Sequence, residues 1–80
     1  MTNHHQLTQE WQEVASGACL IEATKGAAQI HFGAQAPEAD SKACHIIGGV
    51  SQPSLSYGGT LKAWARSGSI GAEIVVTGAV

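Results

Sequence analysis

The stretch that decides the fold class reads Thr60-Leu61-Lys62-Ala63-Trp64-Ala65-Arg66. Small or aliphatic side chains alternate along it with long polar or aromatic ones. Because successive side chains of a β-strand point to opposite faces of a sheet, this alternation predicts a strand with one buried face. The side chains expected toward the core are Leu61, Ala63 and Ala65. The opposite face would carry Lys62, Trp64 and Arg66.

Further segments of this kind occupy most of the chain and are separated by Gly, Ser and Pro turn signals. They cover residues 8–14, 18–24, 27–33, 43–47, 52–57 and 70–77. Together with the stretch above they make about six or seven short strands, and no long segment has the period of a helix. We therefore expect an all-β domain, a small antiparallel β-sandwich, with a small barrel as the alternative.

Local signals add detail to this arrangement. Lys25-Gly26 is a turn signal, so the segments 18–24 and 27–33 are expected to pair as a β-hairpin. The Pro-containing residues 34–42 are expected to form a loop. The segment 8–14 would use Trp11 as its anchor, although a single helical turn stays open there because Gln and Glu favour helix.

The 80-residue chain is expected to form one domain. Its first residues are polar and have no period, so we expect a flexible arm over residues 1–9 and a single β-sandwich over residues 10–80. A chain this short buries only about 60 % of its unfolded surface. Such domains are commonly stabilised by disulfides, a metal or neighbouring subunits, and self-association is therefore expected.

Charged residues make up 12 % of the chain, and the formal net charge is −2; an average soluble domain has about 25 % charged residues. No basic patch is present to bind nucleic acid, and no polybasic segment or long apolar run indicates a membrane. The N-terminus lacks the layout of a signal peptide, so synthesis in a cytoplasm is expected. A charge-poor surface associates readily, so much of it is expected to be covered by other protein.

No set of residues indicates catalysis, a cofactor or a metal ion. None of the seven serines lies in a Gly-x-Ser-x-Gly motif. His45 follows Cys44 directly, so the two side chains point to opposite faces of a strand. The adjacent His4 and His5 lack a third ligand. Cys44 and Cys19 are expected to be unpaired, small apolar residues, and the chain is not expected to be an enzyme.

The most distinctive predicted surface carries Trp64 together with Lys62 and Arg66, and Trp11 is a further candidate contact. Three interpretations are open. Trp64 can cover one sheet face with Arg66 stacked on it. It can anchor a contact between subunits, where aromatic residues and arginine are common. It can also form a ligand site, because a flat aromatic beside hydrogen-bonding groups is how proteins hold sugars.

Read in order, the segments follow a familiar arrangement: Trp11-Gln-Glu-Val14, Ile30-His-Phe-Gly33, Ala36-Pro37, His45-Ile-Ile-Gly48, Ser56-Tyr-Gly-Gly59, Ala63-Trp-Ala-Arg-Ser67 and Ile74-Val-Val-Thr77. It resembles small virion proteins of tailed bacteriophages, which are short β-sandwich domains found as capsid decoration proteins, head or collar fibres and tail appendages. The resemblance covers about residues 10–77. It implies a structural role, symmetric copies that are often trimers, and a capsid or tail protein as partner.

We therefore expect a virion structural protein, a capsid decoration or head or tail fibre subunit that is made in the host cytoplasm and located in the virion. The alternative is a carbohydrate-binding or host-receptor-binding module that uses Trp64. Sugar binding predicts that Trp64 is open to solvent in the assembled state, whereas a structural role predicts that it is buried.

Overall fold

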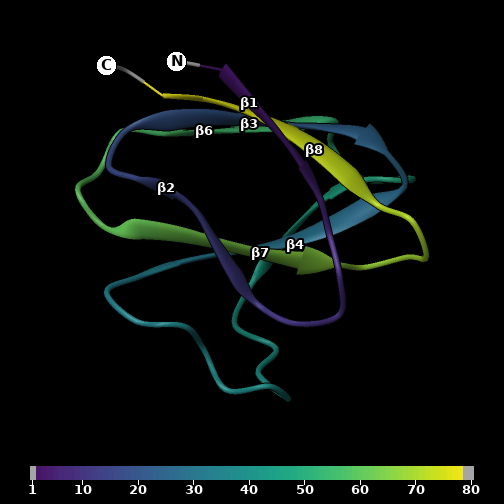
Figure 1. The fold of residues 1–80 in the computed structure, drawn as a ribbon, viewed down its shortest axis with the longest axis horizontal. Helices are drawn as coiled ribbons and strands as arrows, with labels where there is room; N and C mark the ends of the chain where they lie inside the picture. The colour runs from purple at the N-terminus through teal and green to yellow at the C-terminus, as the bar shows by residue number, and fades with distance from the viewer. Residues whose placement is uncertain (1, 79–80) are drawn as a thin grey trace.

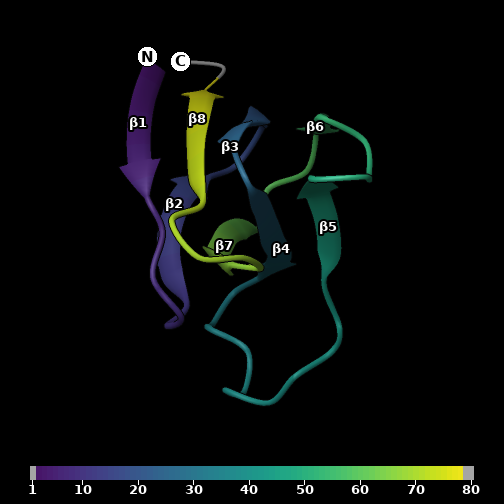
Figure 2. The same ribbon diagram turned by 90° about the vertical axis from the view of Figure 1, so that its right-hand side faces the viewer.

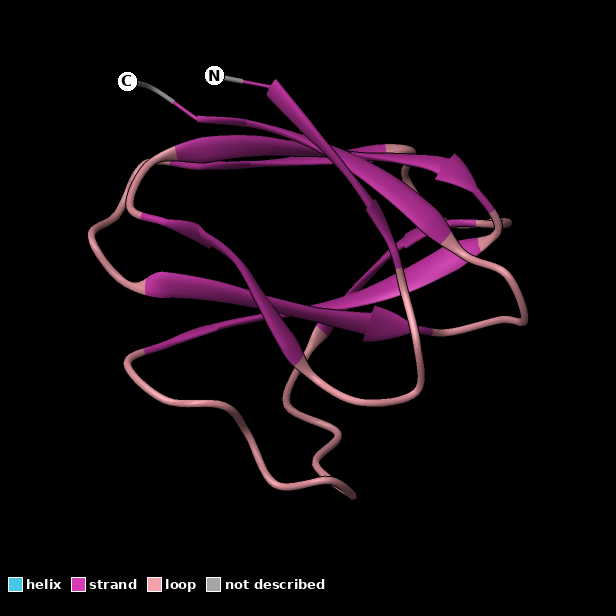
Figure 3. Cartoon of the chain, in the orientation of Figure 1, coloured by secondary structure: helices cyan, strands magenta, loops and turns pink. Residues whose placement is uncertain are grey.

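The computed structural model describes residues 2–78, and these residues form strands and loops with no helix (Figure 3). The strands are β1 (Thr2–Gln6), β2 (Gln12–Ser16), β3 (Cys19–Lys25), β4 (Ala27–Gly33), β5 (His45–Gly48), β6 (Ser54–Tyr57), β7 (Lys62–Ser67) and β8 (Glu73–Gly78). The all-β prediction is confirmed, with eight strands in place of six or seven. Within residues 2–78, no helix is long and apolar enough to cross a membrane.

The strands form two antiparallel sheets that pack face to face (Figures 1 and 2). The first sheet has the order β1-β8-β3-β6 and the second has the order β2-β7-β4-β5. Consecutive strands therefore alternate between the two sheets, except that β4 and β5 are neighbours in the second sheet. This is the strand order of an eight-stranded jelly roll, a sandwich of two Greek keys. The expected β-sandwich is confirmed, and the alternative barrel does not apply.

The core lies between the sheets and is filled by inward-facing aliphatic side chains. Ile21 and Ile74 of the first sheet and Ile30 and Ile47 of the second are all completely buried. Alanines complete the layer on β4, β7 and the turn before β8, at Ala28, Ala63, Ala65 and Ala72. Such small side chains allow the two sheets to approach closely. Leu61, expected in this core, lies outside β7 and is 44 % exposed.

The predicted hairpin of residues 18–24 and 27–33 is wrong. β3 pairs with β8 and β6, whereas β4 pairs with β7 and β5, so the two strands lie in different sheets. Gly26, at a φ of 66°, carries the chain across the sandwich. A turn signal marks where the chain reverses, but it does not say whether the next strand pairs with the last one or packs beneath it.

The flexible arm predicted for residues 1–9 is also wrong for residues 2–6, which form β1 and pair with β8 from Thr2↔Thr77 to Gln6↔Glu73. The pairing continues past the strand, because the amide of Leu7 donates to the Ala72 carbonyl at 2.9 Å. Four of the five side chains of β1 are exposed. Backbone pairing with β8, rather than burial of apolar side chains, therefore keeps this strand in the sheet. Residues 1, 79 and 80 lie outside the described residues.

Candidate functional site

The predicted surface residues gather on the outer face of the second sheet. The antiparallel register places Glu13 of β2 and His31 of β4 on either side of Trp64 of β7. Gln29 lies opposite Arg66 in the same way. Their neighbours Ala63 and Ala65 point into the core and are fully buried. The prediction that Trp64 shares its face with Lys62 and Arg66 is therefore confirmed by the register of β7.

Residues 34–44, between β4 and β5, form the predicted long loop, which lies below the second sheet in the view of Figure 3. Three side chains hold its backbone, and we call them the clasp: Trp11, His31 and Arg66. Nε1 of Trp11 donates to the Glu38 carbonyl at 3.3 Å, and Nδ1 of His31 lies 2.8 Å from the Ala43 carbonyl oxygen.

Arg66 makes the largest contribution to the clasp. Its Nε donates to Oε1 of Gln29 at 2.6 Å, and its two terminal nitrogens donate to the carbonyls of Ala39 and Ser41. The guanidinium also lies over the Trp11 ring, with 4.4 Å between its carbon and the ring centroid. One of the three interpretations of the sequence has Arg66 stacked on Trp64, and its observed aromatic partner is Trp11 instead. A planar guanidinium suits this double role, because it stacks and donates in several directions.

Trp64 is half-buried, and its Nε1 donates to the Gly33 carbonyl at 3.0 Å. Trp11 and Arg66 are half-buried too, through contacts within the chain. Of the four predicted interface residues, only Lys62 is exposed, and its Nζ lies 3.5 Å from Oε1 of Glu13. Segments of the same chain, among them the loop 34–44, thus bury part of the face that another subunit was expected to bury. Whether this face also contacts a second protein stays a prediction.

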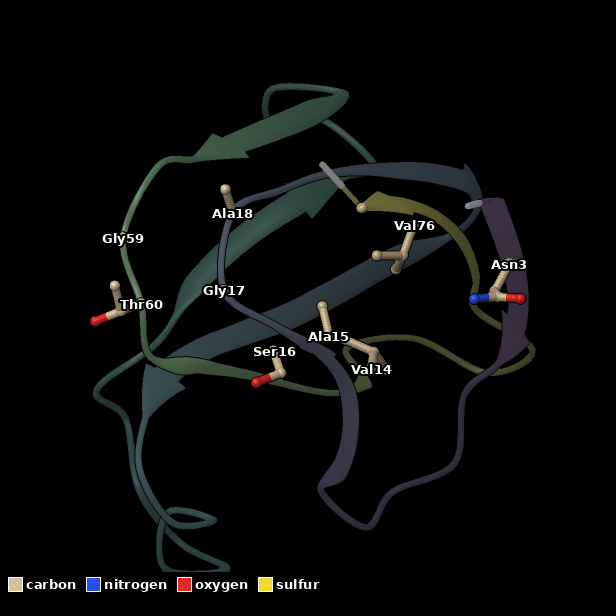
Figure 4. A pocket seen from close by; sticks show the side chains of 10 residues that line it. Asn3, Val14, Ala15, Ser16, Gly17, Ala18, Gly59, Thr60 and Val76 are labelled. Atoms are coloured by element: carbon tan, nitrogen blue, oxygen red, sulfur yellow. The ribbon is translucent and has the colours of Figure 1, made fainter. Parts of the chain in front are cut away.

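A pocket of about 490 Å³ opens between the sheets on the side of β1 and β2. In Figure 4, Asn3 of β1, Val14 and Ala15 of β2 and Val76 of β8 surround a common space. The remaining lining residues are small, and none carries a charge. An uncharged, mostly apolar group such as a partner's side chain would fit its chemistry. The sequence did not indicate this pocket, because its walls come from strands whose pairing was not predicted.

Within residues 2–78, no loop crosses the outer face of the first sheet (Figure 1). We call it the open face, and it carries the outward side chains of Thr2, His4, Gln6, Leu20, Glu22, Ser54, Ser56, Glu73, Val75 and Thr77. Leu20 of β3 is 37 % exposed and lies between the hydroxyl residues Thr77 of β8 and Ser56 of β6. His4 Nε2 lies 2.7 Å from Oε1 of Glu73. Because few formal charges lie here, a protein partner would remove little charge from water on binding.

Two turns at one end of the sandwich expose aliphatic tips. Val50, between β5 and β6, and Ile70, between β7 and β8, are fully exposed. Both turns approach Ala27 of β4: the Gly68 amide donates to its carbonyl at 2.8 Å, and a side chain at Gly49 would lie 3.4 Å from its Cβ. We call this the apolar end. Exposed aliphatic tips on neighbouring turns favour contact with another protein.

Two titratable groups, His5 and Cys19, have pKa values shifted from their ordinary ones. Burial, with a smaller contribution from the neighbouring His4, lowers the pKa of His5 below 6.5. Its Nε2 is buried and has no hydrogen-bond partner within the described chain. Burial also raises the pKa of the Cys19 thiol above 9.0. A raised pKa disfavours the reactive thiolate, so Cys19 acts as a packed apolar side chain, and both it and Cys44 are free thiols.

Among residues 2–78, no three His, Cys, Asp or Glu side chains are grouped as metal ligands would be. The core of this described range contains no buried polar or charged residue. The most developed arrangements are therefore surfaces: the clasped loop, the pocket, the open face and the apolar end. Comparison of the chain with protein-family models, curated proteins and solved structures found no match.

Proposed function

We propose that this protein is a virion structural protein of a tailed bacteriophage, a capsid decoration or head or tail fibre subunit. It acts in symmetric copies, which are often trimers in the resembled proteins, and binds a capsid or tail protein. The observation that supports this most is the open face, a broad surface with few charges on a jelly-roll domain. Jelly rolls occur in viral capsid proteins and also in lectins, so the fold supports the proposal by analogy alone.

The chemistry of the surfaces supports an assembling role in two further ways. Leu20 on the open face and the tips Val50 and Ile70 at the apolar end offer separate apolar contacts. One of these two surfaces can serve contacts among copies of the chain, while the other binds the capsid or tail protein. A chain with 12 % charged residues also loses little charge hydration when such surfaces are covered.

The experiment is to locate the protein in purified particles by mass spectrometry and antibody labelling in the electron microscope. We expect a fixed copy number per particle at one repeated position on the head or tail. A variant with Val50→Ser and Ile70→Ser should fold normally and leave the particle if the apolar end is the attachment surface. Finding the protein only in the soluble fraction of infected cells would contradict the proposal.

The alternative, a carbohydrate-binding module, depends on Trp64. Its ring is half-buried and its N–H already donates to Gly33, which leaves less of it for a sugar. Glycan-array binding that Trp64→Ala abolishes, with unchanged folding by circular dichroism, would favour this alternative. Weaker association of the Trp64→Ala chain without any glycan binding would instead favour a structural role.

A further inference from the structure

The four strands at the sheet edges differ in how readily another strand can join them. β2 carries a bulge between Glu13 and Ala15 and a charged Glu13–Lys62 contact. β5 and β6 are four-residue strands, and β6 follows Pro53 directly. Bulges, charges, proline and short length are the devices that keep edge strands from pairing with other chains. β1 has five residues and none of these devices.

The register shows which backbone groups of β1 are free. In an antiparallel pair, the residues that exchange hydrogen bonds alternate along the strand. Leu7 donates to Ala72, so its alternate neighbours His5 and Asn3 are also bonded to β8. The N–H and C=O groups of the residues between them, Thr2, His4 and Gln6, therefore point away from β8 to the open edge.

We propose that β1 pairs with β1 of a second copy of this chain, antiparallel about a two-fold axis at His4. The outward groups then match completely: His4 faces His4 of the second copy, and Thr2 faces its Gln6 on both sides of the axis. Each of these pairs exchanges two hydrogen bonds. The two first sheets join into one continuous sheet across the dimer. Thr2–Gln6 contains no Lys, Arg, Asp or Glu, so no fixed like charges oppose each other.

The same register places Asn3 of one copy directly opposite His5 of the other on the inner side of the sheet. Directly opposite residues have Cβ atoms about 4.5–5.5 Å apart, within reach of an amide and an imidazole. His5 Nε2 is the buried side-chain atom that has no partner within the described chain. Because this atom is already buried in the single chain, the His5 ring must turn toward the open edge before the Asn3 amide of the second copy can donate to it.

This pairing does not depend on a role in a virion. It is a two-fold contact, so by itself it builds a dimer of twice the 8.2 kDa chain mass, whereas the phage resemblance implies trimers. A trimer in solution would overturn the β1 pairing and leave the proposed function standing. Absence of the protein from purified particles would overturn the proposed function and leave the β1 pairing standing.

The test compares His4→Pro with His4→Thr by light scattering after gel filtration at micromolar concentration. The His4 N–H points outward, so proline removes a contact to the second copy without removing a bond to β8, and edge positions of this kind tolerate proline. Threonine keeps the N–H and the strand. We expect a dimer for the wild type and for His4→Thr, and a folded monomer for His4→Pro. A wild-type monomer, or a His4→Pro dimer, would overturn the pairing.

A second measurement decides the matter if His4→Pro fails to fold. Opposed residues of a hydrogen-bonded pair have Cα atoms about 5.5 Å apart, within the range that a disulfide spans. His4→Cys in a Cys44→Ala background should therefore form a covalent dimer under mild oxidation. Gln6→Cys in the same background should not, because it faces Thr2 of the second copy. Equal cross-linking of the two variants, or none, would overturn the register.

Discussion

At the scale of single residues, the clasp side chains Trp11, His31 and Arg66 hold the loop between β4 and β5. They come from three different segments and bind four carbonyl groups of one loop. The sequence marked Arg66 and Trp11 as candidate contact residues but did not indicate that they bind a loop of the same chain. Alternation along a strand shows which face a side chain occupies, but not which distant loop returns to cover it. The sequence also contained no sign that His31 would reach the Ala43 carbonyl.

Arg66→Ala is predicted to release the loop 34–44 while leaving the sandwich folded. It removes the hydrogen bonds to Gln29, Ala39 and Ser41 and the stacking on Trp11. Hydrogen bonds made by charged groups contribute about 1.5–3 kcal/mol each, although partial exposure reduces that value here. Hydrogen exchange should become at least several-fold faster in the loop amides and stay unchanged in β3 and β8.

The matched control for Arg66→Ala is Lys62→Ala. Lys62 lies on the same strand face, but it is exposed and makes one long contact to Glu13. Such surface pairs contribute little, so its loop exchange should equal that of the wild type. If both variants exchange alike, the clasp does not hold the loop.

His5 makes the stability of the protein sensitive to acid. Its pKa in the folded chain lies below 6.5, chiefly because it is buried. The unfolded chain therefore binds a proton at a higher pH than the folded chain does. The free energy of unfolding is then complete above about pH 6.5 and falls as the pH decreases toward the folded pKa, by at most about 1.4 kcal/mol per pH unit.

Thermal melting between pH 7.5 and pH 5 tests this prediction. The melting temperature of the wild type should fall with pH, and His5→Gln should flatten the curve. His45→Gln, at an exposed position, serves as the control and should keep the wild-type slope. An unchanged slope in His5→Gln would show that other groups carry the acid sensitivity.

At the scale of strands and turns, the sequence predicted where most strands lie but not how they pair. The alternation of Lys62–Ser67 located β7, and the Pro-containing stretch 34–42 was recognised as a loop. β1 was missed because Thr2–Gln6 has no apolar pattern, and its strand structure depends on the β8 backbone. Pairing is decided between segments far apart in the chain, as for Thr2 and Thr77. A local pattern cannot contain that information, and the predicted hairpin failed for this reason.

Gly48→Ala is predicted to be among the most destabilising small substitutions in the chain. Gly48 has a φ of 82°, which side chains rarely adopt, and a Cβ there would lie 2.2 Å from the Gly26 carbonyl oxygen and 2.7 Å from the Ala23 Cβ. Strain of this kind costs about 1–3 kcal/mol before the clash is counted. Chemical denaturation should show a loss of at least that size.

Gly58→Ala provides the matched control, since Gly58 has nothing within 4 Å of an added Cβ and no positive φ. The substitution there should change the free energy of unfolding by about 0.5 kcal/mol or less, as is usual at the surface. Equal effects at the two positions would contradict the close approach of the Gly26 and Gly48 turns.

At the scale of the whole molecule, the composition and the fold lead to the same conclusion. Thin packing on alanines leaves a small core in which four isoleucines are the largest fully buried side chains. The surface has few charges, an open face on one sheet and two exposed aliphatic tips at one end. A domain of this size gains stability when neighbouring copies bury more of its surface. The central claim is therefore that this chain functions as an assembled subunit.

Sedimentation equilibrium of the wild-type chain tests that claim most directly, over a concentration range from about 1 to 100 µM at pH 7.5. With unbound subunits and assemblies in exchange, the average mass should rise with concentration from 8.2 kDa toward a whole multiple of it. Circular dichroism should show β-structure throughout. A folded chain whose mass stays at 8.2 kDa over the whole range would contradict the account.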